Sequence, residues 1–145
     1  MLQEFNAGHT DACVRLFYDV FTSGEWQMPW LTVENIRRYF DDLCRTPQFI
    51  GYVWMEADRL LGACLGIASD YFDAPQYEIK EIFVAPDCQG QGIGGRFLAE
   101  VEGGLRQKGI QVMTLFTSRG IPAYSFYVKR GYIQNEETVH FMKTL

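Results

Sequence analysis

The feature that most constrains this chain is a glycine-rich turn between a strand and a helix. Residues 77–84 carry a strand pattern that Pro86 stops, and an apolar helical stripe begins at Ile93. The turn reads Gln89-Gly90-Gln91-Gly92-Ile93-Gly94-Gly95. Glycines let the backbone close around a ligand, and a helix start presents unpaired N–H groups that bind anions. The order of strand, glycine turn and helix therefore predicts a phosphate-binding loop.

Hydrophobic periodicity predicts the helices. Apolar residues recur with helical spacing over 13–21, where Thr10 is expected to cap the helix, and over 36–44, where Thr32 precedes the first turn. A further short helix is expected from Pro122 to Lys129, since proline suits a first turn. The helices therefore lie before, between and after the strand patterns.

Runs of β-branched and aromatic residues bounded by turn residues predict the strands. The expected strands cover residues 49–56, 60–68, 77–84, 112–117 and 139–142. The first two read as an antiparallel hairpin, and the strand–helix–strand unit that follows requires a parallel pair. We therefore expect the α/β class, with a mixed central sheet of about six to seven strands and helices on both faces.

Length and composition restrict the classes of protein. At 145 residues the chain is expected to form one domain, residues 1–145, and 48% hydrophobic residues are enough for a core. Its apolar runs are too short to span a bilayer, and Met1–Phe5 carries no signal-like pattern. The net charge of -5, without a basic stripe, argues against nucleic acid. We expect a cytoplasmic protein with no membrane or nucleic-acid partner.

The cysteines do not suggest a metal or a disulfide framework. They lack the close spacing of a zinc site, and only His9 and His140 are available to help them. We interpret them as reduced thiols that fill the core, and we expect no metal. The residues concerned are Cys13, Cys44, Cys64 and Cys88.

Other interpretations of the glycine turn fit less well. Gly90, Gly92 and Gly95 formally satisfy the dinucleotide pattern G-x-G-x-x-G, but the expected acidic residue about 20 positions later is missing at 117–119. An NADP-binding reductase, with Arg119 on the phosphate, remains a minor alternative. A tight turn that binds nothing is another, although four glycines with interleaved glutamines exceed what a turn requires.

Two motifs give the chain a family resemblance. Residues 84–94 resemble the acetyl-CoA pyrophosphate loop of the GNAT superfamily of N-acetyltransferases, and residues 123–132 resemble its Ala-x-x-x-Tyr-x-x-x-Gly-Phe/Tyr signature. The loop motif is matched by Gln89, Gly92 and Gly94, with Val84 and Pro86 as its lead-in. One departure is the loop 118–121, where the family commonly has an asparagine.

The resemblance implies a GNAT-like fold and acetyl-CoA as co-substrate. The sheet is then splayed in the middle, where the strand ending at Val84 parts from the strand ending at Thr117. Backbone groups of Ile82 and Val84 are implied to pair with the pantetheine arm, and Tyr124 is implied to lie along the arm or near the adenine, unless it only packs in the core. The implied pyrophosphate contacts are Gln89, Gly90, Gln91, Gly92, Ile93 and Gly94.

Acetyl transfer to an amine requires a proton acceptor for the amine and a donor for the departing thiolate. Tyr127 is our candidate donor, because a phenol is a neutral O–H donor at pH 7, and the resemblance implies the same role; its alternative is a core aromatic. Glu81 interrupts an apolar strand, and burial would make it a better base. Its alternative is an ordinary solvent-facing residue, with Glu78 as the reserve candidate.

The acceptor wall is expected in two loops. Trp26 and Trp30, within residues 25–30, suit an apolar or cationic group, and residues 70–73 form a second aromatic and acidic loop. Together with Glu81 they favour a small cationic primary amine, attacked directly in a ternary complex. Either tryptophan could instead cap the core. The other candidate function is a non-catalytic acyl-CoA-binding sensor of the same fold, and a homodimer is allowed in both cases.

Overall fold

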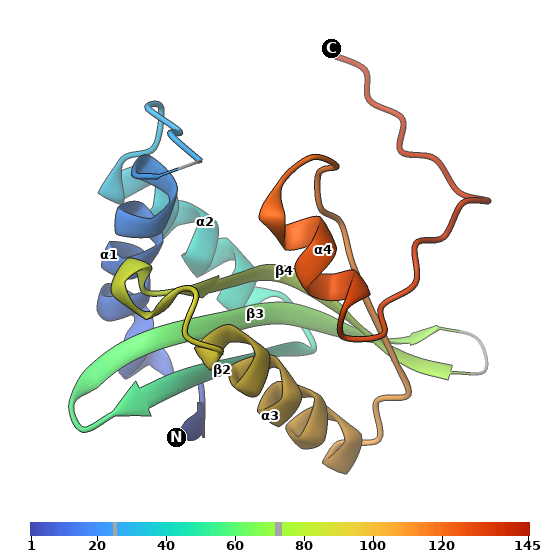
Figure 1. Cartoon of the computed structure of the whole chain (residues 1–145), viewed down its shortest axis with the longest axis horizontal. Coiled ribbons are helices and arrows are strands. Elements are labelled where there is room, and N and C mark those ends of the chain that lie inside the picture. The colour runs from blue at the N-terminus through green and yellow to red at the C-terminus, as the bar shows by residue number, and fades with distance from the viewer. Residues whose placement is uncertain (25, 72–73) are drawn as a thin grey trace.

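The computed structural model describes residues 1–24, 26–71 and 74–145, and within them the sheet has five strands (Figure 1). The strand order is β1-β2-β3-β4-β5, antiparallel except for the parallel pair β4 and β5. The strands are β1 (Leu2–Glu4), β2 (Phe49–Glu56), β3 (Arg59–Tyr71), β4 (Ala74–Val84) and β5 (Val112–Leu115). The mixed α/β class is confirmed, although the strand number is smaller than expected and β1 was not predicted.

Helices cover both faces of this sheet, as the sequence predicts. They are α1 (Thr10–Thr22), α2 (Val33–Arg45), α3 (Ile93–Gln107) and α4 (Pro122–Val128), with short 3-10 turns η1 (Ala7–His9) and η2 (Pro86–Cys88). Helices α1 and α2 enclose one aromatic core with Phe83 of β4. Helices α3 and α4 enclose a second core with Tyr77 and Ile79 of the same strand.

The start of α2 has a side-chain cap at Thr32, whereas the predicted cap of α1 at Thr10 is wrong. The Thr32 hydroxyl oxygen accepts a hydrogen bond from the Asn35 N–H, and the Asn35 side-chain oxygen accepts one from the Thr32 N–H. Helix α2 therefore begins with a reciprocal capping box. Thr10 is not a cap, because it is the first residue of α1. The Asn6 side chain instead caps η1, which leads directly into α1. A 3-10 turn before the helix moved the cap upstream of the position that the apolar spacing predicts.

The predicted strand at residues 139–142 is wrong. No helix or strand is found after α4, and the tail runs away from the sheet (Figure 1). Its apolar side chains are open to solvent, with Phe141 87% exposed. A run of β-branched and aromatic residues suits a strand, but a strand also needs a neighbour to pair with. This tail has none among the described residues.

Strands β4 and β5 part where the sequence predicts. Their parallel pairing runs from Gln76 opposite Val112 to Ile79 opposite Leu115 and then stops. Strand β4 continues to Val84, paired there with β3 alone. The second half of β4 therefore has an open edge, and this edge leads into the glycine turn.

Candidate functional site

The open edge of β4 presents backbone groups in alternation. The Ala85 N–H donates to the Leu61 carbonyl at 2.8 Å, which fixes Ala85 and Leu61 as a hydrogen-bonded antiparallel pair. Counting back through the register, Phe83 also faces β3, whereas Ile82 and Val84 point their backbone groups away from it. These are the two residues whose backbone the sequence analysis assigned to the pantetheine arm. That assignment stays a prediction, with suitable backbone geometry.

A β-bulge sets which way the side chains of this segment point. Glu81 pairs with Leu65 and Ile79 pairs with Gly66, so Lys80 is an extra residue without a partner in β3. One inserted residue reverses the alternation. Ile79 therefore lies in the α3–α4 core, whereas Phe83 lies in the α1–α2 core. Glu81 lies on the same face of the strand as Phe83. The bulge turns Glu81 toward α2.

Glu81 meets a tyrosine of α2 there. The Tyr39 hydroxyl donates to Glu81 Oε1 at 3.0 Å. Burial raises the pKa of the Glu81 carboxyl from 4.5 to about 7, and the Tyr39 hydrogen bond partly opposes that rise. A carboxylate with this pKa holds or releases a proton near neutral pH, which is the range a general base requires. The geometry fits the predicted role of Glu81 and rules out a fully exposed residue.

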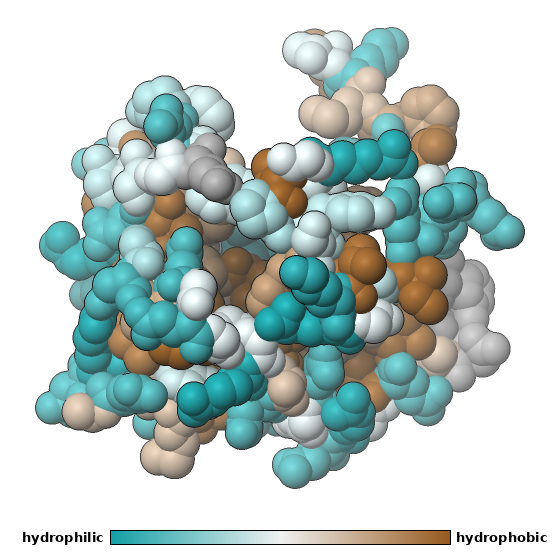
Figure 2. All heavy atoms as spheres, viewed as in Figure 1, coloured by the Kyte–Doolittle hydropathy of each residue, from teal (hydrophilic) through white to brown (hydrophobic). Residues whose placement is uncertain are grey.

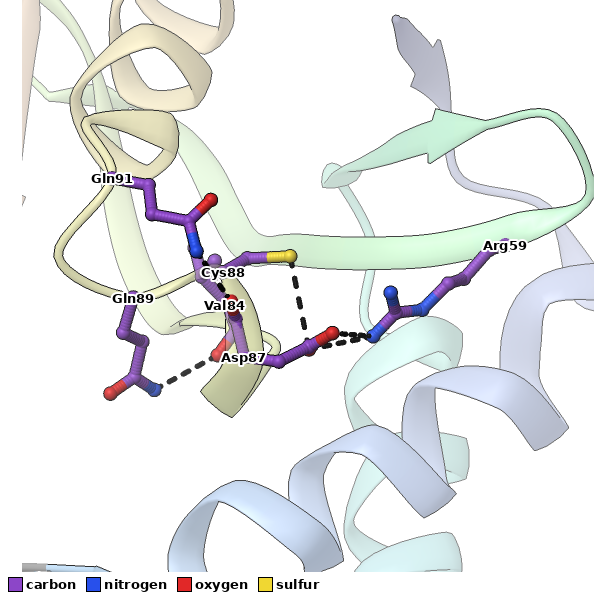
Figure 3. Close-up of polar contacts among 6 residues, drawn as sticks. All are labelled: Arg59, Val84, Asp87, Cys88, Gln89 and Gln91. Carbon is purple, nitrogen blue, oxygen red and sulfur yellow. Dashed lines mark hydrogen bonds and ion pairs between the residues drawn. The ribbon is translucent and has the colours of Figure 1, made fainter.

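Side chains brace the glycine turn at the end of β4 (Figure 3). The Gln89 amide donates to the Val84 carbonyl at 3.0 Å, and the Gln91 amide donates to the Asp87 carbonyl at 2.8 Å. Arg59 of β3 holds the Asp87 carboxylate through both oxygens, at 2.6 and 2.7 Å. The two glutamine side chains therefore hold backbone carbonyls on either side of the turn, and contact of the loop N–H groups with an anion stays a prediction.

The loop delivers unpaired N–H groups at the start of α3. Gly90 and Gly92 have φ angles of 74° and 77°, a left-handed conformation that other residues rarely adopt. Gly92 is the N-cap and provides no side-chain cap, and no acidic residue occurs in the first turn. The guanidinium of Arg130 lies so close to Gly95 that a β-carbon there would collide with it. The helix start and this arginine together make a positively polarised surface.

Tyr127 lies on α4, facing the sheet. Its side chain is buried in the α3–α4 core, and its ring packs edge-on against Phe126 and Tyr132. Burial raises the pKa of Tyr127 to about 12, and the neighbouring Cys64 and Glu81 add to that rise. At neutral pH, Tyr127 keeps its proton.

Three other predicted contact residues bond to the tail, pack on the core or face solvent. The Tyr124 hydroxyl donates to Gln134 Oε1 in the tail at 2.8 Å, a contact that the sequence analysis did not foresee. Trp26 packs edge-on against Phe21, with ring centroids 5.1 Å apart, so it partly caps the α1–α2 core. Trp30 is 67% exposed. Their roles toward coenzyme or acceptor stay predictions.

The second predicted acceptor loop needs correction. Asp70 and Tyr71 belong to strand β3, so they do not form a loop. Phe72 and Asp73 lie outside the described residues, as does Glu25 of the first loop. Figure 2 shows a recess between the α1–α2 side of the molecule and α4, with hydrophobic atoms at its floor. This recess lies over the open half of β4, in the region where Figure 1 labels that strand.

The cysteines and the other metal-binding residue types were also considered in the sequence analysis. Cys13, Cys64 and Cys88 are buried free thiols and Cys44 is a half-buried one, as interpreted from the sequence. Within the described residues, His, Cys, Asp and Glu side chains form no group suited to a metal ion. Over the same residues, no helix combines the length and the apolar character needed to cross a membrane.

Sequence reasoning missed three parts of this site. Tyr39 has the helical spacing of a core residue, and only the fold brings it to Glu81. The pairing of Arg59 with Asp87 joins residues far apart in sequence, so no local pattern reveals it. Arg130 stands inside the second motif. Only the fold brings its positive charge next to Gly95, because the two residues are 35 positions apart in sequence.

Several solved structures superpose on nearly the whole of this chain. A possible acetyltransferase from Clostridium difficile 630 superposes with a TM-score of 0.82 and 13% identity, covering 100% of this chain and 97% of the other. A transcriptional regulator from Bacillus halodurans C-125 gives 0.78 and 15%, covering 99% of both chains. The aminoglycoside acetyltransferase meta-AAC0020, from an uncultured soil metagenomic sample, in complex with sisomicin, gives 0.73 and 17%, covering 100% and 95%. At these identities the likeness shows the fold alone.

The open strand, the glycine loop and the shared fold thus define an α/β protein with a mixed, splayed sheet. A family model for the Acetyltransferase (GNAT) family matches residues 12–132. The chain therefore belongs to the GNAT family, whose members are acyltransferases that use acetyl-CoA. A comparison with curated proteins gave no match.

Proposed function

We propose that this protein transfers an acetyl group from acetyl-CoA to a primary amine of a small cationic acceptor, within a ternary complex. The observation that carries the proposal is the open half of β4. A half-buried carboxylate, Glu81, lies on this segment, the glycine loop follows it, and a buried, protonated phenol, Tyr127, lies on α4. Family membership adds the coenzyme.

The coenzyme is proposed to extend β4 like an added strand. The outward N–H groups of Ile82 and Val84 and the outward carbonyl of Ile82 are available to the amides of the pantetheine arm. The Val84 carbonyl already accepts a bond from Gln89, so it is the least available of these groups. The pyrophosphate then lies on the N–H groups that open α3, within residues 89–94, close to Arg130.

The chemistry balances with two side chains. The neutral amine nitrogen attacks the thioester carbon, so the C–N bond forms and the C–S bond breaks. Glu81 accepts the proton that leaves nitrogen, directly or through a water, and later releases it to solvent. Tyr127 gives its proton to the departing thiolate sulfur and regains one from water. The products are an amide and the free thiol.

The acceptor is proposed to lie in the recess between α4 and the α1–α2 side. Glu81 favours a cationic amine, and the rings of Trp26 and Trp30 suit either its charge or its apolar body. The similar aminoglycoside acetyltransferase makes amino sugars a sensible member of any substrate panel. We also propose a cytoplasmic location and a single catalytic domain, with a homodimer as an open option.

The test is release of free thiol from acetyl-CoA across a panel of polyamines, amino sugars, amino acids and peptide amines. Turnover with any amine supports the proposal. Tight binding of acetyl-CoA with no turnover on the whole panel would instead support the non-catalytic sensor.

Tyr127→Phe tests the assignment of the thiolate donor. The substitution keeps the ring, so folding and coenzyme affinity should barely change, while turnover should fall about ten- to a thousandfold as for a lost acid catalyst. Tyr132→Phe is the matched control, because it removes a neighbouring hydroxyl whose bond is to Glu102. A wild-type rate in Tyr127→Phe, with chemistry rate-limiting, would leave the thiolate to water.

A further inference from the structure

Tyr39 joins α2 to the open half of β4 through one hydrogen bond. Its hydroxyl reaches Glu81 Oε1 at 3.0 Å across 42 residues of sequence. The ring is 39% exposed, next to Phe40, which is fully buried in the α1–α2 core. The packing of Phe40 therefore fixes α2 at this point, and it holds the Tyr39 hydroxyl in place.

This bond governs how the Glu81 carboxylate is presented. Among residues 1–24, 26–71 and 74–145, the Glu81 side chain makes this hydrogen bond through Oε1. A carboxylate on a half-buried strand has several rotamers, and a bond to one oxygen selects among them. The other oxygen, Oε2, then remains to accept a proton.

The surroundings leave Tyr39 as the neutral donor at this carboxylate. On β4 itself, Glu78 is paired with Lys80 at 3.1 Å. On α4, Tyr127 is a further titratable group, and the charge of Glu81 adds to the rise of its pKa. The residue opposite in β3 is Leu65, which does not titrate. Helix α1 approaches the strand through apolar rings, Phe17 and Phe21, which pack on Phe83.

Tyr39 also keeps its proton over the working range of pH. Burial, and then the nearby Glu81 charge, raise the pKa of its phenol above the ordinary value. A group that stays protonated remains a donor while Glu81 gains and loses its own proton. Its bond favours the carboxylate form, since a donor stabilises the charged acceptor.

We propose that Tyr39 is a positioning residue for the proton acceptor of this enzyme: its hydroxyl fixes Glu81 Oε1, so that Oε2 takes the proton from the acceptor amine. This inference rests on the proposed function of Glu81 as the base. It adds a residue from α2, outside both sequence motifs, to the machinery of amine deprotonation.

The first test follows the Glu81 carboxyl carbon by 13C NMR during a pH titration of the full chain. Tyr39→Phe keeps the ring and removes the donor, so the midpoint for Glu81 should rise by about half to one pH unit. Tyr18→Phe is the matched control: this tyrosine lies on α1, is 36% exposed, and should leave the midpoint unchanged. An unchanged midpoint in Tyr39→Phe would overturn the proposal.

The second test is the pH profile of kcat/KM for the acceptor amine. In Tyr39→Phe the acid limb should move to higher pH by the same amount as the NMR midpoint, with KM for acetyl-CoA unchanged. A shifted NMR midpoint with an unmoved limb overturns the positioning role, although the bond itself exists. If Glu81→Gln keeps the wild-type rate, the proposed base is wrong, and this outcome is separate from the NMR result on Tyr39.

Discussion

The two halves of β4 carry out different tasks on the same strand. Residues 76–79 pair with β3 on one side and with β5 on the other, and Tyr77 and Ile79 are buried in the α3–α4 core. Residues 81–84 pair with β3 alone, beyond the point where β5 departs. The first half is held by neighbours on both edges, and the second half keeps one edge free for a ligand.

Polar groups are treated differently in the two halves. The Tyr77 hydroxyl is fully buried, and it donates to the Ile50 carbonyl at 2.7 Å, so its burial is compensated. Glu81 is half-buried with a single tyrosine donor, and its pKa is correspondingly raised. A poorly compensated carboxylate costs stability, so the comparison teaches that the open half is built for chemistry at some expense to folding.

Glu81→Gln should give the largest effect that separates the halves. Turnover should fall about ten- to a hundredfold at mid-range pH, and the loss should shrink at high pH, where the free amine already dominates. The measurement is kcat against pH. Glu78→Gln is the control, because Glu78 lies on the same strand but is paired with Lys80. A pH-independent loss would indicate a structural role, and no loss would exclude the residue.

The same Glu81→Gln variant should fold more stably than the wild type at pH 8. The folded pKa of Glu81, about 7, lies above the ordinary 4.5, so protonated Glu81 favours the fold below pH 4.5 and that advantage disappears as pH rises through 7. Removing the charge should gain about 1–3 kcal/mol at pH 8 and nothing below pH 4. Denaturant unfolding at the two pH values measures the difference. A variant less stable at pH 8 would contradict the contrast between the halves.

Ile79→Val should show the opposite behaviour with a smaller effect. Ile79 is 6% exposed in the half that is paired on both edges, and deleting one buried methylene costs about 1 kcal/mol. Denaturant unfolding should record that loss, while kcat should stay near wild type. A larger effect on kcat than on stability would mean that the halves are coupled.

Much of the fold follows from local patterns. The hairpin strand at Phe49–Glu56 has the predicted bounds, and α2 begins directly after Thr32 as expected, because both depend on neighbours within a few residues. The tail strand failed for the converse reason. Its β-branched and aromatic residues are present, but pairing is a property of the whole sheet, and no local pattern states whether a partner edge will be reached.

The site was only partly visible in the sequence. The glycine motif locates the loop, because the spacing of glycines is itself the requirement. The direction of Glu81 was not predictable, since regular alternation puts it on the same face as Ile79, and the bulge at Lys80 reverses that. A bulge is decided by the pairing of two strands, so one strand's residues do not reveal it. Tyr39 was missed because its contact with Glu81 joins a helix and a strand that are 42 residues apart in sequence.

The open edge of β4 also has a consequence in time, which exchange with heavy water would measure. The N–H groups of Phe83 and Ala85 point toward β3, whereas those of Ile82 and Val84 point outward. In the free protein, the outward pair should therefore lose its protons to deuterium well before the inward pair. Saturating acetyl-CoA should slow exchange at Ile82 and Val84 and leave Phe83 and Ala85 nearly unchanged. Among four consecutive amides, the exchange rates of Phe83 and Ala85 thus report on the stability of the fold, and those of Ile82 and Val84 report on ligand binding.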